Sequence, residues 1–389
     1  MNIVDLVVVG LVVGALVMGA RTGAAVQVLS FAGFWVGLLA GSAVAPAVAR
    51  LFSSTVLKVT AGLVTPFLVA GIVAVLGGRV GQQAAELLDR VGWRRVDAAA
   101  GSVFSGAAVL LSLWLAGIML ASGPWPAAAR AIRGSVVLRA LDRNLPSPPS
   151  VLARMQRVLD PSGFPSVFAG LEPDLGSPVA LPDDAVVRSA VAKAGASTVR
   201  IVGIGCGGVV DGSGFVAGPG LVVTNAHVVA GIDRPVVEDR RGRHAATPVL
   251  FDSGLDVAVL RADGLAGPVL PLARGLAPPG TAGAALGYPG GGPFRAVPAA
   301  VRRSLVAVGR DIYGERITTR AVYELQATIR PGNSGGPLVN ADGTVLGVVF
   351  SRSVAQPQVG YALVSDDIAS RLRTAAARAG RVGTGDCAA

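Results

Sequence analysis

Three residue types that together can activate a hydroxyl as a nucleophile occur in the second half of the chain, in the order His227, Asp256 and Ser334. A serine hydroxyl becomes nucleophilic when an imidazole removes its proton, and a carboxylate then holds the imidazole in one tautomer and stabilises its cation. Each residue alone has an ordinary structural interpretation, as a core histidine, a strand-end aspartate or a turn serine. Their occurrence together in one region favours acyl-transfer chemistry.

Ser334 lies in the stretch RPGNSGGP, residues 330–337, where glycines surround the candidate nucleophile. Because Gly332 has no side chain, its backbone N–H and that of Ser334 can converge on one point and bind the oxyanion of a tetrahedral intermediate. The glycines at 335 and 336 let the chain leave the turn sharply. We therefore predict an oxyanion hole formed by Gly332 and Ser334.

Short strands are the elements that would position these residues. Apolar runs broken by glycine and proline occur at residues 197–205, 212–220, 221–229, 256–262, 282–290, 321–328, 343–351 and 358–364. Many short strands at this spacing indicate an all-β barrel or sandwich rather than alternating strands and helices. A helix is expected from Asp366 to Ala379, with Ser365 placed to cap it.

Four stretches resemble the chymotrypsin-fold serine proteases, especially the bacterial trypsin-like branch that includes the HtrA enzymes. They are GSGF at 212–215, VVTNAHVV at 222–229, DVAVL at 256–260 and QATIRPGNSGGPLV at 326–339. The resemblance implies a double β-barrel and hydrolysis of peptide bonds by a triad of His227, Asp256 and Ser334, with no metal or cofactor. It also implies a specificity pocket lined by Thr328, Phe350, Ser351 and Arg352.

The sequence departs from these relatives at two points. Asn333 stands where the digestive trypsins carry the aspartate that pairs with a newly cut N-terminus, so we do not expect activation by that ion pair. The stretch after Pro337 is too short for a peptide-binding PDZ domain, so the PDZ-regulated assembly of the HtrA enzymes is not expected.

Long apolar stretches occupy the first third of the chain, at residues 3–20, 22–49, 59–78 and 103–121. A helix of roughly 20 residues crosses the hydrocarbon core of a bilayer, and each stretch is long enough to do so. A cleaved signal peptide would account for the first stretch but not for the other three. We therefore predict a membrane domain of four helical spans.

The charges of the short loops predict the orientation of these spans. The first and third loops contain Arg21, Arg79, Arg90, Arg94 and Arg95, whereas the second contains Arg50 and Lys58. Short loops rich in arginine and lysine stay in the cytoplasm. Both termini and everything after residue 121 are therefore expected on the extracytoplasmic, periplasmic side of the cell membrane.

Small residues indicate how the spans pack. Gly33, Gly37 and Gly41 repeat at four-residue spacing in the second span, which favours close packing inside a helix bundle over a dimer interface or a conduit. Asp5, together with the turn GARTG at 19–23, resembles the start of the colicin V production (CvpA) membrane family.

Prolines separate the membrane domain from the β-rich domain, at 146, 148, 149, 161, 165, 173, 178 and 182. This density predicts a semi-rigid tether with one short helix, roughly Val151 to Leu159. We therefore divide the chain into a CvpA-like membrane domain at 1–121, a linker at 122–180 and a trypsin-like domain at 181–389. The tether could also be cut, by the protein itself or by another protease, and the sequence leaves this open.

Composition limits the partners that the chain can bind. The 389 residues are 52% hydrophobic and 15% charged, with a formal net charge of +10. The arginines are scattered singly rather than gathered with aromatic residues, so nucleic acid is not expected as a partner. The expected partners are the lipid bilayer and a protein or peptide substrate in the cell envelope.

Cys206 and Cys387 are the two cysteines, and their separation excludes a zinc ribbon or a CxxC redox motif. A disulfide, two idle thiols and pairing with another chain all remain possible from the residues alone. A CvpA-like anchor joined to a trypsin-like domain resembles the MarP family of actinobacterial membrane-anchored periplasmic serine proteases, which is associated with acid resistance. In that family two cysteines form a disulfide within the protease domain, which implies a Cys206–Cys387 bond.

Two functional hypotheses follow from these observations. The first is a membrane-tethered serine endopeptidase acting outside the membrane, and the second is a catalytically silent protease fold that serves as a sensor or scaffold for the membrane bundle. The complete set of His227, Asp256 and Ser334 favours the endopeptidase, because a silent relative would be free to lose one of them.

Overall fold

The structure is a computed structural model that describes residues 2–52, 55–121, 125–148, 164–265, 267–354, 356–378 and 380–388. It divides into two compact units, here called the first and second units. The first unit contains Met1–Ala116 and Ser135–Leu138, and the second contains Gly117–Gly134 and Arg139–Ala389. Most of the predicted linker therefore belongs to the second unit, and the boundaries at residues 121 and 180 stay predictions.

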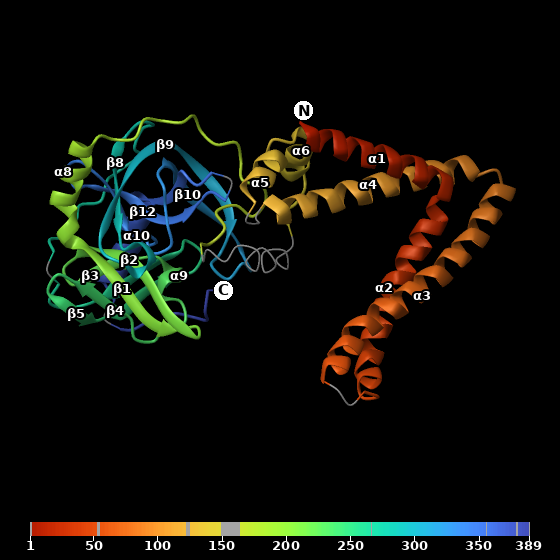
Figure 1. Cartoon of the computed structure of the whole chain (residues 1–389), viewed down its shortest axis with the longest axis horizontal. Coiled ribbons are helices and arrows are strands. Elements are labelled where there is room, and N and C mark those ends of the chain that lie inside the picture. The colour runs from red at the N-terminus through yellow and green to blue at the C-terminus, as the bar shows by residue number, and fades with distance from the viewer. Residues whose placement is uncertain are drawn as a thin grey trace. The chain divides into compact units, whose positions relative to one another are not determined.

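Four long helices form most of the first unit: α1 (Ile3–Thr22), α2 (Ala24–Ala49), α3 (Thr55–Arg90) and α4 (Arg94–Ala121) (Figure 1). Each contains a stretch long and apolar enough to cross a membrane. Large apolar side chains such as Leu39 and Phe67 point outward, with 72% and 63% of their surface exposed. An aqueous protein would bury such side chains, whereas a helix in lipid exposes them.

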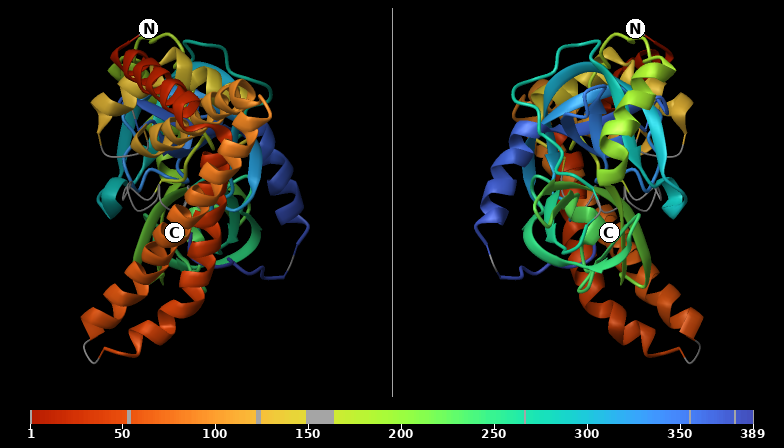
Figure 2. Two further views of the ribbon diagram at one scale, coloured as in Figure 1. Left: turned by 90° about the vertical axis from the view of Figure 1, so that its right-hand side faces the viewer. Right: turned by 90° about the vertical axis from the view of Figure 1, so that its left-hand side faces the viewer.

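Helix α2 packs closely along α3, and the two lie side by side in both views of Figure 2. A methyl group added at Gly33 would lie 2.6 Å from the carbonyl oxygen of Val73, and one at Gly37 would lie 2.7 Å from the Cα of Ala70. The same holds at Gly41, where the added group would lie 2.7 Å from the Cα of Pro66. The predicted packing of these glycines inside the membrane domain is confirmed.

Asp5, the single acidic residue of α1, is fully buried in the first unit. Its Oδ1 accepts hydrogen bonds from the Ser135 hydroxyl at 2.6 Å and from the Val137 N–H at 3.1 Å. A carboxylate without partners in a bilayer would be costly, so this pairing explains how α1 tolerates an acid near its start.

The segment after α4 was predicted to contain a single short helix, and this prediction was incomplete. The structure has α5 (Pro126–Arg133) and α6 (Val136–Asn144), and the predicted helix at 151–159 lies outside the described residues. Proline does not prevent these helices, because Pro126 occupies the first turn of α5, where its missing N–H is not needed. Helix α6 ends before Pro146.

The second unit consists of two antiparallel β systems. The first is a seven-stranded sheet in the order β5-β4-β1-β2-β3-β7-β6, and the second is a closed barrel in the order β10-β13-β12-β11-β8-β9 (Figure 1). The sheet strands are β1 (Thr198–Gly205), β2 (Gly208–Gly218), β3 (Leu221–Thr224), β4 (Val236–Asp239), β5 (Gly242–Ala245), β6 (Thr247–Asp252) and β7 (Val257–Arg261). The barrel strands are β8 (Ala282–Gly287), β9 (Arg295–Arg310), β10 (Ile317–Gln326), β11 (Pro337–Asn340), β12 (Val345–Arg352) and β13 (Val359–Val364).

The predicted fold class, four apolar helices followed by a β-rich domain with a C-terminal helix, is confirmed. All eight predicted strand regions contain a strand, and β11 begins directly after the Ser334 loop, where the sequence PGNSGGPLV is expected to run from loop into strand. Strands β4, β5, β6 and β9 were not predicted. The unit also contains α8 (Asp184–Ala194), α9 (Ala226–Val229) and α10 (Ser365–Ala376), with 3-10 turns at Gly195–Ser197 and Pro289–Gly291. Ser365 does not cap α10 as predicted, because its hydroxyl donates to the Val345 carbonyl instead.

The largest buried cluster of apolar side chains joins the sheet to the barrel. Phe215 and Val223 from the sheet and Leu286 and Leu363 from the barrel belong to it, and all four are fully buried. Side chains of this size stabilise a fold by roughly 1.5 to 3 kcal/mol each when fully buried. The cluster therefore fixes the position of each half relative to the other.

Within the second unit, the residues from 164 to 177 pack on the barrel. Ala169 N–H donates to the Val308 carbonyl at 3.0 Å. Glu172, with 7% of its surface exposed, accepts hydrogen bonds from the hydroxyls of Tyr361 and Ser353 and forms an ion pair with Arg133. Burial lowers the pKa of Arg133 to about 10, and burial raises the pKa of Tyr361. Glu172 therefore links α5 to the end of β12 and to β13.

We predict that Glu172→Gln destabilises the second unit by about 3 kcal/mol, because Arg133 would remain buried without a counter-charge. The thermal midpoint of the full chain's second unit in detergent should fall by roughly 6 to 12 °C. The matched control is Asp174→Asn, which removes an ion pair with Arg139 in which the Asp174 side chain is 66% exposed. That change should cost below about 0.5 kcal/mol. Equal midpoints for the two variants would contradict the role of Glu172.

Candidate active site

His227 and Asp256 are brought together by the seven-stranded sheet. His227 lies on α9, directly after β3, and Asp256 lies in the turn before β7. The Nδ1 atom of His227 is 2.7 Å from Oδ2 of Asp256, and the backbone N–H of His227 donates to Oδ1 at 2.9 Å. Asp256 is fully buried, so both carboxylate oxygens act on this histidine away from solvent.

The turn that carries Asp256 is held in a conformation that most residues avoid. Asp256 has a φ of 65°, in the left-handed region, where aspartate is among the better tolerated residues. Its N–H donates to the Asp252 carbonyl at 2.9 Å, and its carbonyl accepts from Asn225 Nδ2 at 2.8 Å. Burial opposes the ionisation of Asp252, but hydrogen bonds from Leu255 N–H and Arg371 outweigh it and hold its pKa below the ordinary value of 3.8.

Arg320 of β10 supports the same turn from the barrel side. This arginine has 1% of its surface exposed, and its Nε donates to the carbonyl of Gly254 at 2.8 Å. Its Nη2 donates to the carbonyl of Arg310 at 2.7 Å. Burial lowers the pKa of Arg320, and the charge of Asp256 opposes that effect. Sequence reasoning did not identify Arg320, because an arginine within a strand is usually interpreted as facing solvent.

Ser334 lies in a loop that hydrogen bonds fold into a turn. Asn333 Oδ1 accepts from the Arg330 N–H at 3.0 Å, and the Asn333 N–H donates to the Arg330 carbonyl at 3.0 Å. The Pro331 carbonyl accepts from the Gly290 N–H at 2.7 Å. Gly332 has a φ of 90°, and a side chain there would lie 2.4 Å from the carbonyl oxygen of Tyr288. Glycine is therefore required at this position by both conformation and space.

Ser213 of β2 joins this loop to the sheet. Its hydroxyl donates to the Gly332 carbonyl at 2.6 Å and accepts from the Tyr288 N–H at 2.9 Å. Its backbone N–H donates to the Ser334 carbonyl at 2.8 Å, and its carbonyl accepts from the Thr224 hydroxyl at 2.7 Å. Ser213 was not predicted as a site residue. The only signal for it was its place in the GSGF stretch.

A cavity of about 240 Å³ brings the candidate residues together. His227, Gly332 and Ser334 line it, along with Phe164, Cys206, Val210, Asp211, Val228, Ala230, Pro331 and Ala388. Within the described part of the chain, the N–H groups of Gly332 and Ser334 donate no hydrogen bond, so both are available to a ligand oxygen. No hydrogen bond joins the side chains of His227 and Ser334 among these residues, which is common in a site without substrate.

The residues predicted to line the specificity pocket are not gathered around this cavity. Thr328 lines a separate cavity, and Phe350 is fully buried with the Arg320 guanidinium 6.0 Å from its ring centroid. The Ser351 hydroxyl donates to the Pro165 carbonyl at 2.8 Å, and the Arg352 guanidinium lies 5.6 Å from the ring centroid of Phe164. The specificity pocket therefore stays a prediction. Strand pattern alone could not place residues 164 and 165 beside β12.

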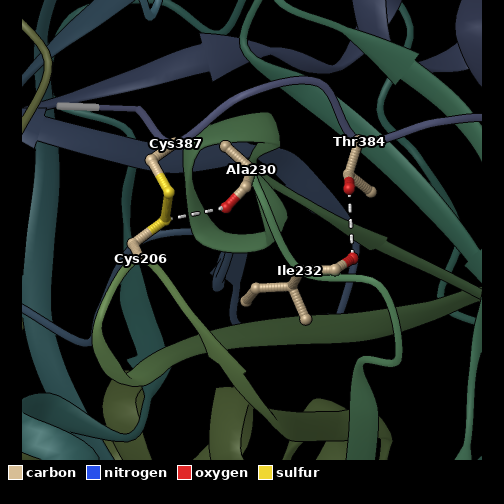
Figure 3. The surroundings of a disulfide bond; sticks show 5 residues. All are labelled: Cys206, Ala230, Ile232, Thr384 and Cys387. Atoms are coloured by element: carbon tan, nitrogen blue, oxygen red, sulfur yellow. Dashed lines mark hydrogen bonds between the residues drawn. A yellow bond between two sulfur atoms is a disulfide. The ribbon is translucent and has the colours of Figure 1, made fainter.

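Cys206 and Cys387 form a disulfide in the structure (Figure 3). The Thr384 hydroxyl donates to the Ile232 carbonyl at 3.1 Å, and the Gly231 N–H donates to the Thr384 carbonyl at 3.3 Å. The disulfide ties the tail that follows α10 to the turn between β1 and β2, and the hydrogen bonds hold it against the chain just after α9. Because α9 carries His227, the tail supports the segment that positions the imidazole.

Known proteins resemble the chain over both units. A trypsin-like peptidase domain family matches residues 212–348, and the colicin V production protein family matches residues 4–146. The serine protease Rv3671c of Mycobacterium tuberculosis is 34% identical over 389 residues, which covers 98% of this chain and 98% of that protein. The crystal structure of the Rv3671c protease in its active form is 40% identical, with a TM-score of 0.53, and covers 56% of this chain and 99% of that one. A probable DegP-like periplasmic serine endoprotease of Halomonas elongata is 36% identical over 174 residues, covering 42% of this chain and 35% of that protein.

A trypsin-like fold, the two family matches and these relatives define a serine endopeptidase joined to a membrane domain of the colicin V production type. The chain belongs to the family of the serine protease Rv3671c, which is the MarP family that its sequence resembles. The predicted class of enzyme is thus confirmed.

We predict that Ser213→Ala slows the reaction of Ser334 with a fluorophosphonate probe by about tenfold to a hundredfold, because small displacements of catalytic groups have effects of this size. The loss of the hydroxyl frees the Gly332 carbonyl and the Tyr288 N–H, so the donors of the loop are no longer held in place. The control is Ser370→Ala, which removes a hydroxyl that donates to Asp367 on α10. A labelling rate equal to that control would contradict the positioning role.

Proposed function

We propose that His227, Asp256 and Ser334 form a catalytic triad that hydrolyses peptide bonds, with Gly332 and Ser334 supplying the oxyanion hole. Two observations carry this proposal. His227 is paired with the buried Asp256 and lines one cavity with Ser334, and the N–H groups of Gly332 and Ser334 donate no hydrogen bond within the described residues. Serine proteases require this combination of nucleophile, base, orienting carboxylate and donors.

In the first half of the reaction, the Ser334 hydroxyl attacks the carbonyl carbon of the substrate while His227 takes its proton at Nε2. Asp256 holds Nδ1–H and stabilises the resulting imidazolium. The negative charge moves to the carbonyl oxygen, where the N–H groups of Gly332 and Ser334 bind it. His227 then gives its proton to the leaving amine, and an acyl group remains on Ser334. A water molecule then attacks the acyl group while His227 takes its proton. His227 returns that proton to Ser334, and the peptide product leaves as a carboxylic acid.

The membrane unit gives this chemistry its proposed location. Four candidate spans and the loop charges support an extracytoplasmic location for both termini and the protease unit. The substrate is then a protein or peptide of the cell envelope. The association of the MarP family with acid resistance supports a role in envelope stress or acid resistance for this chain.

We expect Ser334→Ala to abolish labelling of the full chain by a fluorophosphonate probe, because the reactive hydroxyl is gone. Asp256→Asn should lower the labelling rate by about four orders of magnitude, since the imidazole would lose its correct tautomer. Asp263→Asn, at an exposed aspartate just after β7, is the control and should label normally. An unmutated protein that does not label would instead support the silent scaffold.

Orientation can be tested with single added cysteines. Leu51 and Val91 are 82% and 67% exposed and lie in the second and third loops. In intact cells a membrane-impermeant maleimide should label Leu51→Cys and leave Val91→Cys unlabelled until the membrane is opened. The native cysteines do not react because they are bonded to each other. The reverse labelling pattern would place the protease unit in the cytoplasm.

A further inference from the structure

A single loop separates two cavities in the second unit. The catalytic cavity, defined above, is lined by Gly332 and Ser334. The outer cavity, of about 750 Å³, is lined by Pro289, Gly290, Pro293, Arg295, Ala296, Val297, Pro298, Thr328, Arg330, Pro331 and Asn333. Pro331 lines both, so residues 330–334 form a wall whose alternate residues face different cavities. Whatever fills the outer cavity therefore touches the chain that carries the oxyanion donors.

The outer cavity combines apolar walls with positive charge. Four prolines and two aliphatic residues provide the apolar surface, and Arg295 and Arg330 are the charged lining residues. Both arginines are exposed, and within the described part of the chain neither is paired with a carboxylate. No aspartate or glutamate lines this cavity. Its charge is therefore complementary to an anion.

Asn333, which also lines the outer cavity, has a buried side chain. The residue is 1% exposed, its Oδ1 accepts from Arg330, and its Nδ2 has no hydrogen-bond partner among the described residues. A buried donor without an acceptor is costly and uncommon. At the same place the digestive trypsins carry an aspartate that pairs with an ammonium group. Here an amide donor and two cations give the opposite polarity.

We propose that the outer cavity binds a peptide segment that carries a carboxylate, and that this binding holds the loop at residues 330–334 in its oxyanion-binding conformation. A carboxylate between Arg295 and Arg330 would form charge-assisted hydrogen bonds with both. The restraint passes to Gly332 through Pro331, whose carbonyl is bonded to Gly290 in the floor of the same cavity. A peptide fits better than a small inorganic anion, because the prolines offer apolar surface beyond the charged groups. The inference deepens the proposed proteolytic function and rests on it.

Binding is tested on the full-length Ser334→Ala protein in detergent, so that no probe is cleaved. The probes are the end-blocked tetrapeptide Val-Pro-Ala-Glu, its glutamine analogue, and Val-Pro-Ala-Ala with a free or an amidated C-terminus. The two carboxylate-bearing probes separate a side-chain source from a terminal one. We expect at least one of the two carboxylate-bearing probes to bind. Its neutral analogue should bind at least about tenfold more weakly, and added salt should weaken the binding of the charged probe.

Variants assign the binding to the outer cavity. Arg295→Gln should weaken the charged probe by about tenfold, the loss expected for one charge-assisted hydrogen bond. Arg274→Gln removes an exposed arginine that does not line this cavity and should leave affinity unchanged. Affinity equal in the two variants, or no binding of any charged probe, overturns the proposal. Binding that disappears when Ser334 of the unmutated protein is blocked by fluorophosphonate also overturns it, because the probe would then occupy the catalytic cavity.

The effect on activity is measured as the fluorophosphonate labelling rate of the unmutated protein. The charged probe should raise this rate several-fold. Arg295→Gln should reduce or abolish that rise, whereas Arg274→Gln should retain it. A protein that binds the probe but never labels contradicts the proposed proteolysis and leaves the binding site standing. A protein that labels at the same rate with and without bound probe contradicts the coupling.

Discussion

The hydrogen bonds of Ser213 join the two halves of the protease unit at the proposed catalytic site. Ser213 belongs to the seven-stranded sheet, whereas its partners at Gly332, Ser334 and Tyr288 belong to the barrel half. His227 and Asp256 belong to the sheet half. A rigid contact between the halves is therefore needed before the proposed nucleophile and base can work together. The buried apolar cluster supplies the rigidity, and Ser213 supplies the alignment.

The position of Asp256 shows a second dependence on both halves. Its unusual backbone conformation needs support from several directions, because a non-glycine residue in the left-handed region is strained. Asn225 and Asp252 support it from the sheet, and Arg320 reaches the adjacent Gly254 from the barrel. Arg320 is buried at the cost of desolvation, which only specific hydrogen bonds and nearby carboxylates can offset. The buried guanidinium of Arg320 thus helps to fix the turn that carries Asp256, the carboxylate that is paired with His227.

A site residue or segment could be predicted from the sequence where its role follows from its immediate neighbours in the chain, and not where it depends on contacts with distant residues. His227, Asp256 and Ser334 lie in short stretches whose residue types already imply their chemistry, and Gly332 was predictable because its backbone must approach other groups closely. Ser213 and Arg320 act through contacts with residues distant in sequence, which no local pattern encodes. The apolar spans were predictable by length and composition. The docking of residues 164–177 was not, because proline density indicates an extended chain without indicating what it packs against.

The loop at residues 330–334 is the part of the site with the least structure of its own. Gly332 and Gly335 both have a positive φ, and glycine loses more conformational freedom than any other residue when it is ordered. No strand or helix includes the loop, so its shape comes from contacts with Ser213, Gly290 and its own Asn333. A loop held only by a few contacts can lose its donor geometry without unfolding the sheets around it. A ligand in the proposed outer-cavity site would therefore act on a part of the chain whose shape can change at low cost, and it would act through Arg330 and Pro331, which line that cavity.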